Sequence, residues 1–543
     1  MLVAPPMVPS KALRPEWLPA VALSSALAVL MLLWSPPVGD LAAQVFRTEL
    51  FHQAGLAIWN GSWYGGHYTL TYSVLFPPLA ALLGPQAVGT IAVVSSAYLF
   101  DRLVRDRWGA EARWATLWFA AGVVTLLADG QLTFALGVAF GLAALRCLQL
   151  GRRTPAALAA AACALGSPVA AVFLAGVVLA GAVELGRRTS RAALLVAGVA
   201  LFLTLAPNVA FPEPGQFPFV FSSYVAIPLW CAGALIVTRG LREQERELRR
   251  VVIGYLLAAT VIWLIPNALG GNAVRLGALF GGPVLAAVVL SRRPRVSPWF
   301  LALFLVGSLY WQLTASVAQI ARSVGDPATE AAFFEPAERW LRAHGGEGMR
   351  IEVPPTANHW ESAYLAPDFD LARGWLRQLD TTRDDIFYGE DPLTVAAYGN
   401  WLRENAISYV ALPDAPLDYS SAAERRLILR GPPYLDLRWS SPHWRIYEVR
   451  DPRPLVAPLA GGAATTRWVG RQGFALDVTR PGDFLVRVSF TPYWSISRGA
   501  GCIRRRGDWT VAHASRPGVL RVSADFSLGR AWNAVTGSAG GRC

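Results

Sequence analysis

Residues 17–35 read WLPAVALSSALAVLMLLWS, and this uncharged stretch decides the class of the fold. A helix needs about 20 apolar residues to cross the hydrocarbon core of a bilayer, so the stretch is long enough for one crossing. Lys11 and Arg14 precede it, but no small-residue cleavage pattern follows, whereas further apolar runs do. The sequence therefore predicts an uncleaved membrane anchor rather than a signal peptide.

The apolar runs that follow predict a polytopic α-helical membrane domain with about eleven spans in all, several of them short or broken. The Ser167-Pro168 pair leaves open whether residues 155–184 form two short helices or one kinked helix, and Pro77-Pro78 raises the same question in the second run. The runs lie near residues 73–100, 114–128, 131–149, 155–167, 168–184, 192–206, 217–238, 251–265, 274–290 and 298–320.

Composition and charge agree with a membrane protein. Of the 543 residues, 54% are hydrophobic and 16% are charged, against roughly 25% charged in soluble domains. The net charge of +12 would suggest an acidic partner, but it divides into +11 for the first 325 residues and +1 for the remainder. Arginines gather in alternate connections between the runs, which marks those loops as cytoplasmic. We therefore expect no nucleic-acid partner, but a multi-pass plasma-membrane protein with a cytoplasmic N-terminus.

The chain after residue 325 has ordinary globular composition and, by the same charge rule, lies outside the cytoplasm. The predicted domains are 1–325 for the membrane domain, 326–452 for an α/β subdomain and 453–543 for a β-sandwich with a mobile C-terminus. Helices are expected at 327–344 and 391–405, and strands at 349–353, 407–413 and twice within 438–449. Cys502 and Cys543 leave a disulfide open, and no cysteine spacing fits a metal.

The first outer loop, residues 36–84, holds the most informative polar residues. Asp40 stands just past the first span, where a carboxylate keeps access to water and its proton affinity can still be tuned by apolar surroundings. Residues 41–59 are amphipathic and fit a helix in the membrane interface. A group that suits a sugar or head group follows, although an aromatic belt has the same composition. It comprises Trp59, Asn60, Trp63, Tyr64, His67, Tyr68 and Tyr72.

These features resemble the membrane glycosyltransferases of the GT-C fold. The resemblance rests on an aspartate after the first span, an interfacial helix, a Trp/Gly-rich loop and an aromatic-Pro-Pro-Leu motif, here Phe76-Pro77-Pro78-Leu79. Within that superfamily, the chain looks most like the group labelled 6-pyruvoyl-tetrahydropterin-synthase-related membrane proteins. The motifs cover about residues 35–85, and the overall plan of spans plus an extracytoplasmic module covers the rest.

The resemblance implies transfer of a sugar from a polyprenyl-phosphate donor to a cell-envelope glycan, lipid or protein, with inversion and with Asp40 as general base. Arg275, one of few outer arginines, is the candidate partner of the donor phosphate, together with Asn272 and His52. The candidate acceptor residues are Trp63, His67, Tyr68 and Tyr72. Many GT-C enzymes carry adjacent acidic residues where this chain has Asp40-Leu41, so no metal ligand is assigned and a divalent ion is left open as a cofactor.

Simpler interpretations stand beside these assignments. Asp40 is equally placed to begin the 41–59 helix, Arg275 to snorkel toward the interface, and Asp129 to cap the helix after a short outer turn. A transporter or flippase of lipid-linked sugar is the main rival function, although the spans show neither internal repeats nor midplane charges. A non-catalytic envelope scaffold is a third alternative, and no P-loop, GxSxG or HExxH motif indicates other chemistry.

Overall fold

The computed structural model describes residues 16–182, 187–345, 349–389 and 391–537. Contacts divide the chain into two compact units. The helical unit comprises Met1–Gln44, Tyr72–Ala206 and Gln216–Ala321, and the β-rich unit comprises Val45–Thr71, Pro207–Gly215 and Arg322–Cys543. The expected boundary after residue 325 lies close to the change of unit between residues 321 and 322. Two earlier segments, residues 45–71 and 207–215, also belong to the β-rich unit.

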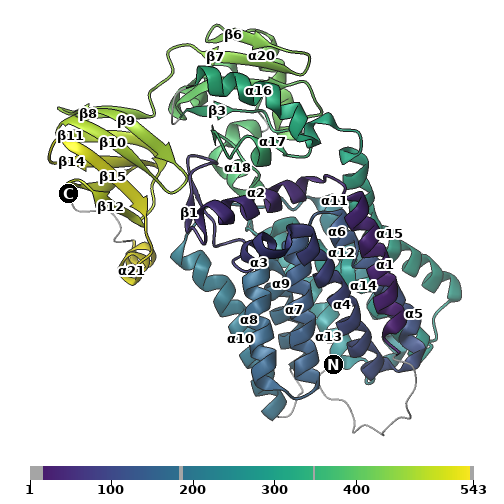
Figure 1. Cartoon of the computed structure of the whole chain (residues 1–543). Coiled ribbons are helices and arrows are strands. Elements are labelled where there is room, and N and C mark those ends of the chain that lie inside the picture. The colour runs from purple at the N-terminus through teal and green to yellow at the C-terminus, as the bar shows by residue number, and fades with distance from the viewer. Residues whose placement is uncertain (1–15, 183–186, 346–348, 390, 538–543) are drawn as a thin grey trace. The chain divides into compact units, whose positions relative to one another are not determined.

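Each apolar run that the sequence indicates contains at least one helix (Figure 1). In the helical unit α7 packs against both α4 and α8, and α14 packs against α5. The helices are α1 Leu18–Trp34, α2 Gly39–Ala54, α3 Phe76–Leu83, α4 Pro85–Trp108, α5 Arg113–Gly122, α6 Thr125–Ala128, α7 Leu132–Gln149, α8 Arg153–Gly166, α9 Pro168–Gly181, α10 Arg187–Ala210, α11 Phe221–Tyr224, α12 Ala226–Val237, α13 Arg246–Leu264, α14 Val274–Arg292 and α15 Pro298–Ser323.

Five helices within the described residues are long and apolar enough to cross a membrane, or six if the bent pair α1 and α2 forms one span. The five are Pro85–Trp108, Leu132–Gln149, Arg191–Ala210, Gly270–Arg292 and Pro298–Ser323. Several of the other helices are too short to cross alone at 1.5 Å per residue. A helical domain with several apolar spans is therefore confirmed, whereas the count of eleven crossings stays a prediction.

Proline decides two of the helix boundaries. Ser167 has extended backbone before Pro168, which ends α8, and its hydroxyl accepts the Ala170 N–H that opens α9. Residues 155–184 therefore contain two helices, the first of the two alternatives. Gly84, with φ of +86°, separates α3 from α4 before Pro85 in the same way.

Helix α2 is not a continuation of α1. The first helix ends at Ser35 in the left-handed conformation, two prolines follow, and the axis turns by 79° before α2 begins at Gly39. A helix that turns this sharply at the end of a span is consistent with the interfacial orientation expected for residues 41–59.

The α/β part of the β-rich unit contains a five-stranded mixed sheet in the order β4-β3-β5-β7-β6. Strands β3, β4 and β5 are parallel, whereas β5, β7 and β6 are antiparallel. Helices α19 and α20 share a core with the sheet. The elements are β3 Arg350–Glu352, β4 Asp370–Leu371, β5 Ile407–Pro413, β6 Leu435–Ser440 and β7 Trp444–Val449, with α16 Ala331–His344, α19 Val395–Glu404 and α20 Ala422–Leu429.

Two four-stranded antiparallel sheets follow, in the orders β12-β15-β10-β9 and β13-β14-β11-β8. Alternate residues of β10 and β11 are buried in one shared apolar core, which is the arrangement of a β-sandwich. The strands are β8 Val456–Ala460, β9 Ala463–Gly470, β10 Gly473–Arg480, β11 Gly482–Ser489, β12 Trp494–Arg498, β13 Gly501–Arg506, β14 Trp509–Ala514 and β15 Gly518–Ala524. Cys543 and the glycine-rich end, and with them the disulfide to Cys502 that the sequence leaves open, lie outside the described residues.

Residues 45–71 are tied into the β-rich unit by backbone hydrogen bonds. The Leu371 N–H donates to the Ser62 carbonyl at 2.9 Å, and the Tyr64 N–H donates to the Leu371 carbonyl at 3.1 Å. The Gly61 N–H donates to the Arg471 carbonyl at 2.8 Å in the turn between β9 and β10. The loop also forms its own short ladder of β1 Trp59–Asn60 and β2 His67–Tyr68.

Candidate active site

Asp40 lies in the first turn of α2 in the helical unit. Its side chain is 25% exposed, so the carboxylate is accessible from one side and protected on the others. The backbone N–H groups at a helix start favour a negative charge there. The local sequence therefore places Asp40 at the start of a helix, where the backbone dipole suits a carboxylate.

Arg275 meets Asp40 within this unit. A 3₁₀ turn at Gly270–Ala273 leads into α14 and places Arg275 in the first turn of that helix. The Arg275 Nη2 atom lies 3.9 Å from the Asp40 Oδ2 atom, at the outer limit of an ion pair, and the guanidinium is also about one quarter exposed. The structure thus brings together the two residues that the sequence selected 235 positions apart.

Asp129 is a second carboxylate beside this pair. It follows α6 and precedes Gly130, which has a φ of +70°. The backbone of Gly130 lies so close to α2 that a Cβ atom on this residue would be 2.6 Å from the Leu41 backbone nitrogen. Burial raises the pKa of Asp129 to about 7, the nearby Ser316 hydroxyl lowers it, the Asp40 charge raises it and Arg275 lowers it. Asp129 is therefore poised to gain or lose a proton near neutral pH.

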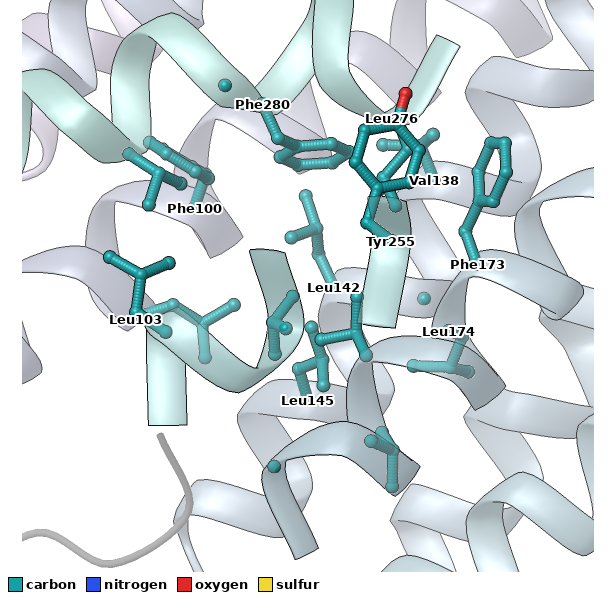
Figure 2. Close-up of a pocket in the computed structure, with 18 of the residues that line it drawn as sticks. Phe100, Leu103, Val138, Leu142, Leu145, Phe173, Leu174, Tyr255, Leu276 and Phe280 are labelled. Atoms are coloured by element: carbon teal, nitrogen blue, oxygen red, sulfur yellow. The ribbon is translucent and has the colours of Figure 1, made fainter. Parts of the chain in front are cut away.

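The Arg275 guanidinium also lies over the ring of Phe134, with its Cζ atom 5.3 Å from the ring centroid. Phe134 belongs to the first turn of α7, and its ring lines a cavity of about 170 Å³ within the helical unit. Helices α4, α7, α9, α12, α13 and α14 supply the mostly apolar lining, which includes Phe100, Val138, Leu142, Phe173, Leu174, Tyr255 and Phe280 (Figure 2).

The cavity extends along the helices. On α7 its lining runs from Phe134 to Leu145, which is about 16 Å at 1.5 Å per residue. Arg107 and Glu247, whose Nη1 and Oε2 atoms are 3.5 Å apart, lie at the opposite end of the lining. An apolar slot of this shape suits a hydrocarbon chain, with the Asp40–Arg275 pair near one end.

The other two phosphate-binding candidates are placed differently. Asn272 belongs to the 3₁₀ turn before Arg275, and its amide donates to the Leu269 carbonyl at 3.0 Å, so it shapes the turn that presents Arg275. His52 is exposed on α2, twelve residues after Asp40, or about 18 Å further along the helix. Asn272 therefore belongs to the turn that leads into Arg275, whereas His52 belongs to the β-rich unit.

Three of the acceptor candidates are buried side chains of the β-rich unit. Trp63 is fully buried and stacks between Phe46 and His67, with ring centroids at 4.1 and 5.2 Å. Burial lowers the pKa of His67 to about 3, and Arg47 and Arg383 lower it further, so the ring is neutral. The Tyr68 hydroxyl pairs with Thr491 at 2.9 Å. These three residues are thus packed inside the unit and are not presented at its surface.

Tyr72 differs from these three because it belongs to the helical unit and is half-buried. It is therefore the one acceptor candidate in the same unit as Asp40. No group of three or more His, Cys, Asp or Glu side chains suited to a metal ion occurs in the part of the chain that the structure describes.

Comparisons with known proteins give similarities of limited extent. No protein-family model matches the chain. A bile acid receptor of Rattus norvegicus, a G-protein coupled receptor, is 30% identical over 176 residues, which cover 30% of this chain. The chain spans about half (51%) of the length of that curated relative. The crystal structure of ArnT from Cupriavidus metallidurans in the apo state aligns with a TM-score of 0.45 and 14% identity over 79% of this chain and 97% of that one. Similarities of this size do not assign the chain to a family.

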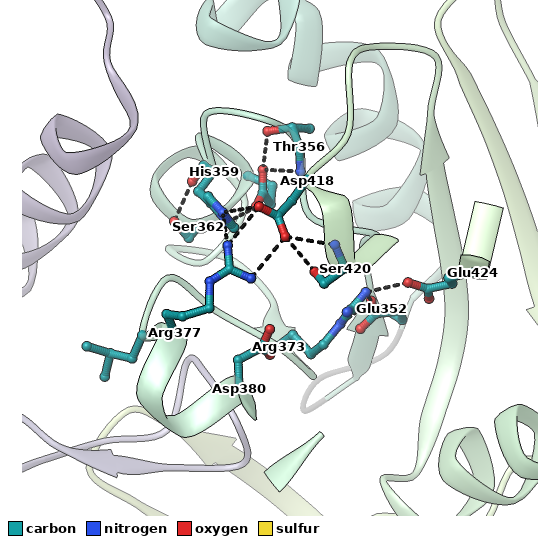
Figure 3. Close-up of polar contacts among 12 residues, drawn as sticks. Glu352, Thr356, His359, Ser362, Arg373, Arg377, Asp380, Asp418, Ser420 and Glu424 are labelled. Atoms are coloured by element: carbon teal, nitrogen blue, oxygen red, sulfur yellow. Dashed lines mark hydrogen bonds and ion pairs between the residues drawn. The ribbon is translucent and has the colours of Figure 1, made fainter. Parts of the chain in front are cut away.

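The β-rich unit contains a separate charge network (Figure 3). Arg377 contacts both carboxylate oxygens of Asp418, at 2.9 and 2.7 Å, and His359 lies 3.6 Å from the same carboxylate. Arg373 donates to Glu352 and Glu424, which ties β3 to α20. None of these side chains lines the apolar cavity of the helical unit, so we assign the network to holding the α/β part together.

The sequence did not indicate a role for Phe134 or Ser316. For Asp129 it left open whether the residue caps a helix or belongs to the site. Phe134 and Ser316 lie within apolar helices, where a phenylalanine or serine carries no signal of its own. Gly130 after Asp129 was the available clue, because a glycine in a three-residue break between helices points to a close approach of the backbone.

Proposed function

We propose that the protein is a membrane glycosyltransferase that moves a sugar from a polyprenyl-phosphate donor to a cell-envelope acceptor outside the cytoplasm. The observation that carries the proposal is the group formed by Asp40, Arg275 and Phe134. A carboxylate, a cation and an aromatic ring that lines an apolar cavity adjoin in one unit. A lipid-linked sugar phosphate presents an anion to the cation and a hydrocarbon chain to the cavity, and the acceptor presents the hydroxyl proton that the carboxylate removes.

Asp40 acts as general base in this proposal. The acceptor hydroxyl oxygen forms a bond to the anomeric carbon from the face opposite the phosphate, and its proton passes to Asp40. The bond between the anomeric carbon and the phosphate oxygen breaks, and the polyprenyl phosphate leaves with the electron pair. The configuration at the anomeric carbon is therefore inverted.

Arg275 stabilises the negative charge on the departing phosphate. A guanidinium pairs with two phosphate oxygens at once, which a point charge cannot do. At rest Arg275 faces Asp40 at 3.9 Å, a separation that leaves the guanidinium able to turn toward a phosphate. Asn272 supports this role by fixing the preceding turn.

Asp129 and the loop residues have supporting roles. When ionised, Asp129 adds a negative charge beside Asp40 and raises the proton affinity of the base. Tyr72 is the acceptor contact that shares a unit with Asp40, and the buried Trp63, His67 and Tyr68 hold the loop in shape. His52 stays a candidate for the donor head group because it is exposed on α2.

The test is Asp40→Asn in purified protein reconstituted with a polyprenyl-phosphate-linked sugar and a hydroxyl acceptor. Removing a general base lowers the rate about a hundredfold to ten-thousandfold, so transfer should fall by about a thousandfold. Glu49→Gln is the matched control, because it makes the same change of charge on the exposed face of α2 and should leave transfer unchanged. Full activity of Asp40→Asn in a folded protein would overturn the proposal.

A flippase of lipid-linked sugar is the second candidate, favoured by the length of the apolar cavity. The lining reaches from Phe134 at the start of α7 to Arg107 near the end of α4, as a lipid path between leaflets would require. The same vesicles distinguish the two functions. Movement of a fluorescent polyprenyl-phosphate sugar between leaflets by both wild type and Asp40→Asn, with no transfer by either, favours the flippase.

A further inference from the structure

The β-rich unit contains a polar cleft that the proposed reaction does not use. Its volume is about 880 Å³, within the range of roughly 300–1,000 Å³ that is typical of ligand sites. Three segments form it. They are the end of α2 with Ser62, the end of α16 with residues 345, 349 and 366–370, and the hairpin tip between β9 and β10.

Close backbone contacts build the walls of the cleft. A Cβ atom on Gly61 would lie 2.8 Å from the Gly470 carbonyl oxygen, so the loop before Ser62 lies against the hairpin tip. Arg471 then links all three segments. Its carbonyl accepts the Gly61 N–H at 2.8 Å, and its guanidinium donates to the Pro367 carbonyl. The cleft is therefore a built feature of the unit and not a gap between loose loops.

The charges that line the cleft balance. Arg342 and Arg471 contribute two positive charges, and Asp368 and Asp370 contribute two negative charges. The Arg342 Nη2 atom lies 2.7 Å from an Asp368 oxygen, and Arg342 keeps 56% of its side chain exposed. A phosphate or carboxylate ligand would meet the two aspartates, and an amine would meet the two arginines. The lining therefore favours a ligand without net charge.

Hydrogen-bonding capacity narrows the ligand class. The guanidinium groups only donate, the carboxylates only accept, and Gln53 and Gln472 do both. A hydroxyl group both donates and accepts, so a ligand rich in neighbouring hydroxyls can hydrogen-bond to each of these kinds of side chain. We propose that this cleft binds a neutral oligosaccharide of several sugar units. Binding of the oligosaccharide to this cleft does not depend on the proposed transfer reaction. Only the idea that the cleft docks the acceptor for transfer rests on the proposed function.

The experiment measures binding of soluble tetrasaccharides of glucose, mannose, galactose, xylose or arabinose to the full chain by calorimetry. The protein is held in nanodiscs, because detergents with sugar head groups would compete. We expect saturable binding of at least one tetrasaccharide. Hydrogen bonds to charged groups contribute about 1.5–3 kcal/mol, so Arg342→Ala and Asp368→Ala should each raise the Kd by about tenfold or more.

The matched control is Arg339→Ala, which removes an exposed arginine from the same helix α16 outside the cleft and should leave the Kd unchanged. Asp40→Asn should bind like wild type, so a failed transfer assay and a failed binding assay are distinguishable. Absence of binding by all five tetrasaccharides, binding of tetragalacturonate or inorganic phosphate in their place, or equal loss in Arg339→Ala would overturn the proposal.

Discussion

Asp129 should give transfer a pH dependence centred near neutrality. Its pKa is raised to about 7, so the carboxyl is neutral below that pH and ionised above it. Ionisation strengthens Asp40 as a base, so kcat/KM should rise through pH 7 in wild type, and Asp129→Asn should lose this rise. The measurement is kcat/KM between pH 5.5 and 8.5. Asp106→Asn, at the other end of the helical unit, is the control, and a rise near pH 7 that persists in Asp129→Asn would contradict the assignment.

At the scale of single residues, the sequence identified the charged members of the site but not the apolar ones. Asp40 and Arg275 stood out because charges are scarce in the outer loops, and scarcity is visible in one sequence. Phe134 acquires its role only because α7 and α14 begin beside each other, and this is a tertiary fact. Trp63 and His67 have residue types that suit a sugar site, yet stacking buries them.

At the scale of elements, the turn between α6 and α7 should control the geometry of the site. Gly130→Ala places a methyl group against the Leu41 backbone nitrogen and strains a left-handed conformation. Displacing Asp129 and Asp40 by about 1 Å costs up to a hundredfold in rate, so transfer should fall at least about tenfold. Gly151→Ala is the control, because its φ of +71° gives the same strain with nothing within 4 Å.

Transfer rates of the two glycine variants in reconstituted vesicles provide the check. Equal losses in Gly130→Ala and Gly151→Ala would show that backbone strain alone matters and that contact with α2 does not. Such a result would contradict the idea that the contact of Gly130 with α2 holds Asp129 beside Asp40.

Apolar runs predicted the helices well, because uncharged stretches of this length have few other stable structures in a membrane. At Ser167-Pro168 the sequence left open whether one kinked helix or two helices form. The capping hydrogen bond of Ser167 shows why two helices form. The 3₁₀ turn before Arg275 had no signal beyond its glycines, since its geometry depends on contacts with residues 217–218.

At the scale of the whole molecule, the charge network in the β-rich unit should make stability depend on alkaline pH. Burial disfavours the charged form of His359, but contacts with Asp418 and Glu361 outweigh it and raise the pKa to about 9. The stabilisation is complete below the unfolded pKa of about 6.5 and is lost as pH rises through 9, and it amounts to at most about 3 kcal/mol.

The midpoint of thermal unfolding of the full chain should therefore fall between pH 6.5 and 9. His359→Gln should flatten this fall, whereas His443→Gln, which changes an exposed histidine of the same unit, should follow wild type. Identical profiles for all three proteins would show that His359 is not charged in the folded chain.

The sequence predicted both parts of the β-rich unit, because alternating strands and turn residues are local signals. It did not predict that residues 45–71 and 207–215 join this unit. Their partners are far away in the sequence, as the hydrogen bonds between Tyr64 and Leu371 and between Tyr68 and Glu213 show. Long-range pairing of this kind leaves no trace in residue periodicity.

The discontinuous β-rich unit also determines the order of events during synthesis. Trp63 leaves the ribosome 308 residues before Leu371, which at about 5–20 residues per second is a wait of roughly 15–60 s. Throughout that interval the aromatic loop is exposed without the strands that later bury it. A nascent chain that ends before residue 322 therefore presents an unfinished surface on which chaperones outside the membrane can act.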